Sequence, residues 1–375
     1  MAVTRKGTAA GLVDWRTVER LAALIPAGPS ASRSARASSV AVLRRSALEA
    51  PAWVARITGL NRAAQQVAET TRVSVVDRAG LVRASTRALR GLMEQVPAPQ
   101  ASEAVRLVGA AEMAGAMSLL ATRLLGQVVP AAGTGADGDG GRGGEASPHL
   151  LLVAPNVLAM RRQLDLDMLD LPAWVCLHEM THAVQLAAAP WLGPYLSDSM
   201  RMVIGAVVEA VYGGPGGGAD GTGEQGLRRR PGRAARIAAR AGRGRVLEGL
   251  TNFKERSEVA SLAAALTFLE GHAEVVLDDV HPNRMPSVHR LRAVLSRSRA
   301  ADAGIGPGPG LGSLLLHRLM GLEAKEAQYA DGTAFVRSVV ARIGHEGLNV
   351  VWTDPALLPT PAEIARPDVW VRRVG

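Results

Sequence analysis

The chain has 375 residues, enough for one large domain or two ordinary ones and too many for a small disulfide-held domain. Hydrophobic residues make up 47% of the chain, which excludes wholesale disorder, and the aromatic content of only 3% favours close-packed helices over a β-sandwich. A single cysteine, Cys176, excludes an intrachain disulfide and a four-cysteine zinc site. The sequence contains no uninterrupted apolar run as long as a membrane span and no leader-like N-terminus, so we expect a soluble, cytoplasmic protein without a membrane partner.

The net charge of +9 is concentrated in one segment of the chain. Residues 226–245 contain eight arginines and no acidic residue, so the rest of the chain is close to neutral. A basic groove on a folded surface, which is the usual footprint of a nucleic-acid-binding protein, is therefore not expected. Nucleic-acid binding would depend on this arginine-rich segment alone, and we do not expect it to be the main function.

The predicted elements are mostly helices. Apolar residues recur three and four positions apart in residues 77–92 and 102–125, which predicts two helices in the N-terminal part. A short apolar run at residues 149–153, followed by a Pro-Asn turn signal, is compatible with a strand. Two further helices are predicted, one from about residue 171 to the proline at 190 and one from about residue 257 to the proline at 282.

Glycine-rich segments suggest how the chain is divided. We expect an N-terminal helical region in residues 1–130, a glycine-rich linker in residues 131–148, and a core in residues 149–375 on which the N-terminal region packs. Residues 213–245 begin with a glycine-rich stretch and end in the arginine run, and we expect them to form a disordered insertion in the core. The expected fold class is mainly α with at most a small β-sheet.

The sharpest signal is an H-E-x-x-H motif formed by His178, Glu179 and His182 within the helix predicted from residue 171. Residues four positions apart lie on one face of a helix, one turn above each other, so both imidazoles can bind one metal ion. The adjacent glutamate then projects toward the open coordination position, where it can take a proton from water that the metal activates. Such nitrogen and oxygen donors suit zinc, and we predict one zinc ion per chain.

Two histidines at this spacing also occur by chance on helix surfaces. Here the flanking residues, 173–177 before the motif and 183–184 after it, are apolar on most sides of the helix, so we expect the helix to be buried. Buried imidazoles need polar partners, and a metal ion supplies one for both of them.

A closed zinc site needs a third protein ligand, which we assign to Glu270 in the helix predicted from residue 257. Glu270, His272 and Glu274 form a polar island in an otherwise apolar helix, where isolated charge is costly. We expect Glu274, one turn further on, to orient a ligand imidazole, and Asp278, another turn on, to join the same network. His272 is the alternative ligand, since it points about 200° away from Glu270 and both cannot bind the same ion. If no metal is bound, the alternative is that these acidic residues form a solvent-exposed face of the helix.

Four further residues could contribute to the site or to the packing around it, although the sequence evidence for each is weaker. Gly271 costs about 1 kcal/mol in a helix interior, which is tolerable if it lets a facing helix approach closely. Cys176 is expected to be a small buried hydrophobe and not a metal ligand. Gln185 could border the cleft, although we expect a packing role. Tyr329 is a candidate for stabilising a developing oxyanion, with a plain helix surface as the alternative.

Stretches along nearly the whole chain outside the linkers match one protein family. They are VDW at 13–15, VVDR at 75–78, LLGQ at 124–127, VAPNVL at 153–158, WVCLHEMTHAVQLAAAPWL at 174–192, LEGHAEVVLDDV at 269–280, GLEAKEAQY at 321–329, GLNVVW at 347–352 and LPTPAEI at 358–364. With these motifs the chain resembles the gluzincin branch of zinc metallopeptidases. More specifically, it resembles the actinobacterial zincin-like metallopeptidase family of type 2, including the branch associated with deazaflavin-coenzyme biosynthesis genes.

The resemblance implies a mainly helical zincin-like fold that binds zinc through the matched His178, His182 and Glu270. The chain departs from the family pattern at Met180 and Leu186, where the family usually has valine and phenylalanine, and both changes keep the apolar character. The resemblance implies little about the substrate, and we infer no bound deazaflavin coenzyme.

The predicted reaction is hydrolysis of a peptide or other amide bond. Glu179 would act as general base toward the attacking water and then as general acid toward the leaving nitrogen. The alternative is a non-catalytic protein, in which zinc holds two helices together and the chain serves as a binding or assembly partner. A fourth protein ligand would indicate the alternative, whereas an open coordination position beside a cleft would indicate the enzyme.

Overall fold

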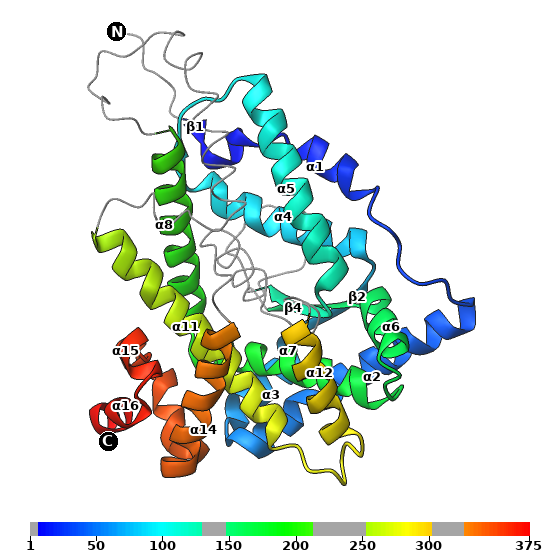
Figure 1. Cartoon of the computed structure of the whole chain (residues 1–375), viewed down its shortest axis with the longest axis vertical. Coiled ribbons are helices and arrows are strands. Elements are labelled where there is room, and N and C mark those ends of the chain that lie inside the picture. Colours follow the sequence, from blue (N-terminus) through cyan, green and yellow to red (C-terminus); the bar gives the residue numbers. More distant parts are fainter. Residues whose placement is uncertain (1–6, 130–147, 213–252, 302–325) are drawn as a thin grey trace.

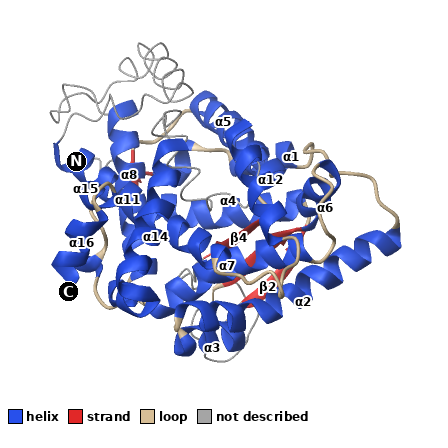
Figure 2. Cartoon of the chain, turned by 60° about the horizontal axis from the view of Figure 1, so that its bottom comes forward, coloured by secondary structure: helices blue, strands red, loops and turns tan. Residues whose placement is uncertain are grey.

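The computed structural model of the chain describes residues 7–129, 148–212, 253–301 and 326–375. These residues are mainly helical and include one three-stranded and one two-stranded sheet (Figures 1 and 2). The expected fold class, mainly α with a small sheet, is confirmed. Nearly all of the predicted linker, and the whole of the predicted insertion at residues 213–245, lie outside the described residues.

The N-terminal part contributes five helices. They are α1 (Trp15–Ala22), α2 (Arg33–Thr58), α3 (Asn61–Thr70), α4 (Arg78–Glu94) and α5 (Glu103–Arg123). Four of them begin at a polar residue whose side chain accepts a backbone N–H from the first turn, which satisfies groups that have no partner within the helix; these residues are Asp14, Ser32, Asp77 and Ser102. The two helices predicted in this part correspond to α4 and α5.

The three-stranded sheet has the order β2 (Arg72–Val76), β5 (His149–Val153) and β4 (Gly126–Val129). β2 runs parallel to the central β5, and β4 runs antiparallel to it. The strand expected at residues 149–153 is therefore confirmed. A separate two-stranded ribbon joins β1 (Gly7–Thr8) to β3 (Pro97–Ala98).

The side chains of the central strand β5 belong to two different hydrophobic clusters, one on each face of the sheet. Leu150 and Leu152 belong to a cluster with α2, α3 and α7, whereas Leu151 and Val153 belong to a cluster with α1, α4 and α5. Successive side chains of a strand point to opposite faces, so an unbroken apolar run is what a strand covered on both faces requires. The sheet therefore lies between two helical layers, one of which contains α7.

The C-terminal part consists almost entirely of helices. They are α6 (Ala154–Gln163), α7 (Asp170–Ala188), α8 (Leu192–Tyr212), α11 (Phe253–Asp278), α12 (Val288–Ala301), α14 (Glu326–Leu348), α15 (Pro361–Ile364) and α16 (Pro367–Val374), with the short 3₁₀ helices η3 (Asn349–Trp352) and η4 (Pro355–Leu357). A further 3₁₀ helix, η1 (Ala9–Leu12), precedes α1 in the N-terminal part. α7 and α11 are the two helices predicted around the metal motifs. α7 packs against α2, α3, α11 and β4, and in Figure 2 it lies directly beside the sheet.

Two glycines let α11 and α14 approach with their backbones in contact. A β-carbon built on Gly271 would lie 2.3 Å from the carbonyl carbon of Gly332, and one built on Gly332 would lie 2.3 Å from the carbonyl oxygen of Thr267. Real β-carbons do not come this close to backbone atoms, so neither position accepts a larger residue without moving a helix. The expectation that Gly271 permits a close helix approach is confirmed.

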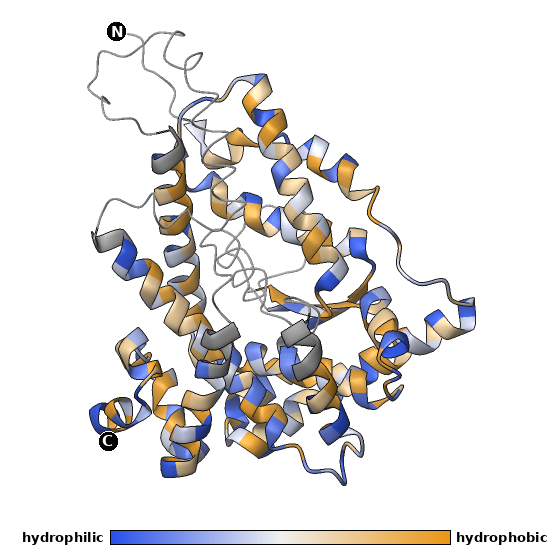
Figure 3. Ribbon diagram, in the orientation of Figure 1, coloured by the Kyte–Doolittle hydropathy of each residue, from blue (hydrophilic) through white to orange (hydrophobic). Residues whose placement is uncertain are grey.

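Among the described residues, two helices are long and apolar enough to cross a membrane when judged by length and composition alone: α5 and residues 256–278 of α11. Neither helix was expected from the sequence to be a candidate membrane span, because neither contains an uninterrupted apolar run of that length. The α11 segment is mostly buried inside the protein, as core helices of this composition commonly are. Figure 3 shows hydrophilic residues between the hydrophobic ones along α5.

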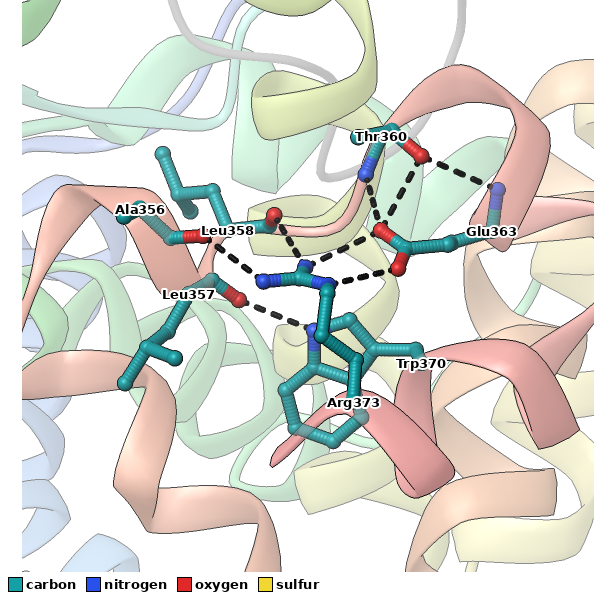
Figure 4. A network of polar contacts seen from close by, with 7 residues as sticks. All are labelled: Ala356, Leu357, Leu358, Thr360, Glu363, Trp370 and Arg373. Atoms are coloured by element: carbon teal, nitrogen blue, oxygen red, sulfur yellow. Dashed lines mark hydrogen bonds and ion pairs between the residues drawn. The ribbon is translucent and has the colours of Figure 1, made fainter. Parts of the chain in front are cut away.

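A polar network holds the C-terminal helices α15 and α16 to the preceding turn (Figure 4). The Glu363 carboxylate accepts hydrogen bonds from Arg373 Nε at 2.6 Å and Nη2 at 3.0 Å and from the Thr360 backbone N–H at 2.9 Å. Arg373 also donates to the carbonyl oxygens of Ala356 and Leu358. Charged groups that are hydrogen-bonded in this way can be buried at little cost.

Candidate metal centre

The H-E-x-x-H motif lies on a helix that is enclosed on nearly all sides. His178 is 0% exposed and Glu179 is 2% exposed, and the apolar residues of α7 around them belong to the core cluster shared with α2 and α3. His182, one turn further along, is partly exposed, with 16% of its side chain accessible. The expected burial of this helix is confirmed, so these imidazoles need partners other than water.

Glu270 from α11 supplies a shared partner to both imidazoles. Its Oε2 lies 3.5 Å from His178 Nε2, and its Oε1 lies 3.6 Å from His182 Nε2. The two Nε2 atoms are themselves 3.3 Å apart. The structure thus brings together the three residues that the sequence assigned as ligands, although Glu270 is separated from His178 by about ninety positions of chain.

These three donor atoms fit a tetrahedral zinc ion. All lie within 4.8 Å of one another, and they form the only such group of three found among the described histidine, cysteine, aspartate and glutamate residues. Ligands about 2.0–2.1 Å from a tetrahedral zinc lie about 3.3–3.4 Å apart. The two Nε2 atoms match this spacing, and each has one Glu270 carboxylate oxygen at a similar distance, Oε2 for His178 and Oε1 for His182. Two imidazole nitrogens and one carboxylate oxygen are also a donor set that zinc prefers.

Without a cation, the same atoms form a tightly coupled ion pair. Burial lowers the pKa of His182, but the nearby Glu270 carboxylate outweighs it and raises that pKa to about 9. Burial acts to raise the pKa of Glu270, yet the two imidazoles outweigh it and hold this pKa well below its usual range. The cluster is thus arranged to attract positive charge, whether it is carried by a proton or by a metal ion.

Glu179 lies next to the cluster but is tied to the sheet. Burial raises the pKa of Glu179, against the opposing effects of His178 and His182, and the charge of Glu270 adds to the increase. The backbone N–H of Val128 in β4 donates to its carboxylate. A β-carbon on Gly126 would lie only 2.7 Å from Glu179 Cγ, so β4 leaves room for this side chain by having a glycine there.

Glu274 and Asp278 differ in their surroundings. Glu274 Oε1 lies 3.7 Å from His178 Nδ1, slightly beyond hydrogen-bond distance, in the place expected for a carboxylate that orients this imidazole. Asp278, one turn further on, forms ion pairs with Arg292 and with Arg337. Its described partners are therefore arginines of α12 and α14, and the imidazoles are not among them.

The alternative ligand His272 lies outside the group of three donors. Its Nδ1 is 3.0 Å from Gln185 Nε2, and its ring stacks on Phe268 with the centroids 6.3 Å apart. Burial, together with the neighbouring His345, lowers the pKa of His272 to about 3, so the ring is neutral. The helical period places it on a different side of α11 from Glu270, as expected.

Three other residues were considered near the site from the sequence: Cys176, Tyr329 and Gln185. Cys176 is fully buried and its Sγ contacts the Leu43 carbonyl, which confirms its interpretation as a small hydrophobe. Tyr329 belongs to the first turn of α14, and its side chain lies outside the described part of the chain. Gln185, for which packing was expected, is instead hydrogen-bonded to His182 Nδ1.

The sequence reasoning missed the contributions of Gln185, Gly126 and Val128. The sequence signal for Gln185 was its position, since it is a polar residue three positions after His182 in an otherwise apolar helix. No local signal marked Gly126 or Val128, because they approach Glu179 only after the strand has paired and α7 has packed against it.

Comparison with known proteins agrees with this geometry. The family profile described as zincin-like metallopeptidase matches residues 13–371. A crystal structure from Chloroflexus aurantiacus, described as "a putative hydrolase with a novel fold", is similar with a TM-score of 0.60 and 21% sequence identity, over 96% of this chain and 98% of that one. This likeness supports the fold. No curated protein matches the sequence. Because the family profile spans nearly the whole sequence, the chain belongs to the zincin-like metallopeptidase family.

Proposed function

We propose that this protein is a zinc-dependent hydrolase that cleaves a peptide or other amide bond. The observation that carries the proposal is the meeting of His178, His182 and Glu270 in a buried, zinc-sized cluster, with Glu179 beside it on the same helix. Membership of the zincin-like metallopeptidase family supports the same reading of the site.

The residues of the site have separate tasks in this reaction. His178, His182 and Glu270 would hold the zinc ion, which would supply Lewis acidity for activating water and polarising the substrate carbonyl. The Glu179 carboxylate takes a proton from the attacking water and passes it to the leaving nitrogen. Burial raises the pKa of Glu179, which favours the protonated form that it must adopt between the two transfers.

One feature of the site favours the enzyme over a non-catalytic zinc-stabilised protein. Among the described residues three donors come within ligand distance of one another, which leaves the fourth tetrahedral position for water or substrate. We favour a peptide as the substrate because the family to which the chain belongs is one of metallopeptidases.

The test combines metal analysis with a cleavage assay. Purified wild-type protein should contain about one zinc per chain, and His182→Ala and Glu270→Ala should lose it. A mixed peptide library analysed by mass spectrometry should show cleavage that stops on chelation. Glu179→Gln should retain zinc while its turnover falls by about 10²–10⁴-fold.

The same experiment separates the two functions. Zinc binding with a large loss of thermal stability on chelation, but no cleavage of any peptide, would support the binding or assembly role. Cleavage by Glu179→Gln at the wild-type rate would show that another group is the base.

We propose the finer family assignment on the sequence motifs alone. The gluzincin-type ligand set and the type 2 branch associated with deazaflavin-coenzyme genes rest on the matched stretches around His178, His182 and Glu270. A bound coenzyme is not part of the proposal. Nucleic-acid binding would require residues 226–245, which lie outside the described residues.

A further inference from the structure

Gln185 lies at the junction of the two helices that carry the metal donors. It is 1% exposed and makes three hydrogen bonds. Its Oε1 lies 2.9 Å from His182 Nδ1, while its Nε2 lies 2.9 Å from the Leu269 carbonyl oxygen and 3.0 Å from His272 Nδ1. Every polar atom of this buried amide therefore has a partner, and two of the three partners belong to α11.

The orientation of the amide follows from these partners. The Leu269 carbonyl oxygen can only accept a hydrogen bond, so the nitrogen of Gln185 must face it and the oxygen must face His182. An amide oxygen can only accept, so His182 Nδ1 must carry a proton. In the neutral ring this leaves Nε2 with its free lone pair, and Nε2 is the atom that faces His178 and Glu270.

His272 completes the arrangement as an acceptor. Its Nδ1 takes the second N–H of Gln185, so both amide hydrogens are used within α11. A flipped amide would place its oxygen about where the nitrogen now lies, against the Leu269 carbonyl oxygen, and neither oxygen can donate. This repulsion alone leaves the amide one stable orientation, whichever tautomer His182 adopts.

We propose that Gln185 is a positioning residue that fixes the tautomer and ring orientation of His182 for metal binding. This inference rests on the proposed zinc site. The Leu269 carbonyl that orients the amide belongs to α11 and lies one residue before Glu270, so the helix that carries the third donor also fixes which way Gln185 faces. His178 is held differently, since its Nδ1 has only the Glu274 carboxylate at 3.7 Å.

The test compares zinc affinity in two variants of Gln185. Gln185→Met keeps the size of the side chain but removes the acceptor, and it should weaken zinc binding by about 10–100-fold in competition with a chelator. Gln185→Glu keeps an acceptor for His182 Nδ1 but loses both donors to α11. It should bind zinc within a few-fold of wild type while its melting temperature falls.

A matched control comes from the same helix. Thr181 is buried, and its hydroxyl donates to the Leu177 carbonyl within α7. Thr181→Val should lower thermal stability without changing zinc affinity, which separates the loss of a buried hydrogen bond from the loss of the acceptor. A nitrogen-15 spectrum of zinc-loaded wild-type protein should show His182 protonated at Nδ1.

Specific results would overturn the inference. Wild-type affinity in Gln185→Met would show that the acceptor is not needed, and equally weak binding by Gln185→Glu would reduce Gln185 to a packing role. Metal bound through Nδ1 of His182 would contradict the proposed tautomer even if a variant failed to fold. A wild-type chain that binds no zinc would overturn the proposed function as well, whereas the preceding results would leave that function intact.

Discussion

Gly126 in β4 lies so close to Glu179 in α7 that a β-carbon on the glycine would be 2.7 Å from Glu179 Cγ and 3.1 Å from its Oε1. The strand β4 therefore positions the proposed base in two ways. Gly126 packs against the Glu179 side chain, and the Val128 backbone N–H donates to the Glu179 carboxylate. The base is held by a strand that contributes no ligand to the metal.

This contact predicts the effect of Gly126→Ala. The added methyl group must displace the Glu179 side chain, so kcat/KM should fall by about 10–100-fold, as small misplacements of catalytic groups do. Zinc content should remain at one per chain, because the three atoms nearest to the added β-carbon all belong to Glu179, which is not one of the metal donors. The measurement is peptide cleavage together with metal analysis.

The matched control for Gly126 is Gly115→Ala in α5. No atom lies within 4 Å of a β-carbon at Gly115, so this variant should keep full activity and gain up to about 1 kcal/mol of helix stability. An active Gly126→Ala enzyme would mean that Glu179 can move without losing its function.

The close contact between α11 and α14 predicts a loss of stability in Gly271→Ala. The new β-carbon would lie 2.3 Å from the Gly332 carbonyl carbon, so the two helices must separate. Overpacking of this kind costs about 1–3 kcal/mol, which urea unfolding should detect. Gly193→Ala in α8, where a β-carbon meets nothing within 4 Å, should leave the unfolding midpoint unchanged or raise it slightly.

Zinc should stabilise the folded protein in proportion to its binding. A ligand at 100 times its Kd that binds only the folded state adds about 2.7 kcal/mol, so the melting temperature should rise with free zinc and fall on chelation. In Glu270→Ala one donor is missing, and the response to zinc should largely disappear. A zinc response in this variant equal to that of wild type would place the metal elsewhere.

Acid should weaken the C-terminal network around Glu363. Burial acts to raise the pKa of Glu363, but the hydrogen bonds from Arg373 and Thr360 outweigh it and hold this pKa below its ordinary value. The folded pKa is thus lower than the unfolded one, so the stabilisation is complete above the unfolded pKa, near pH 4–5, and is lost as the pH falls through the folded pKa.

Arg373→Met tests this network. It should lower the free energy of unfolding at pH 7 by about 2 kcal/mol, because it removes charge-assisted hydrogen bonds to a buried carboxylate. The difference from wild type should shrink when urea unfolding is repeated near pH 3. The neighbouring Arg372→Met, which breaks an exposed pair with Asp368, should cost less than about 1 kcal/mol at either pH.

The meeting of the three candidate metal donors could be predicted because their signals are local. His178 and His182 share a helix face by their spacing alone, and Glu270 is a charged residue in an apolar helix, where a charge needs a partner. The apolar run of β5 was similarly informative, because it is what a strand covered on both faces requires.

The remaining features depend on contacts that no local pattern encodes. β2 and β4 have only five and four residues, too few for a clear period, and they become strands by pairing with β5. The role of Gln185 depends on the position of the Leu269 carbonyl on another helix. The pattern on α11 suggested that Asp278 continues the acidic stripe, but the arginines it contacts belong to α12 and α14.

The order of strands along the chain has a consequence for how such a site can change. The three candidate metal donors come from α7 and α11, which follow β5 in the sequence. The residue that packs against the Glu179 side chain, Gly126, comes from β4, which precedes β5. If the proposed function is correct, substitutions in β4 should alter the position of Glu179 while the three candidate donors keep their arrangement. Sequence changes between related proteins could thus affect the proposed base and the proposed metal site separately.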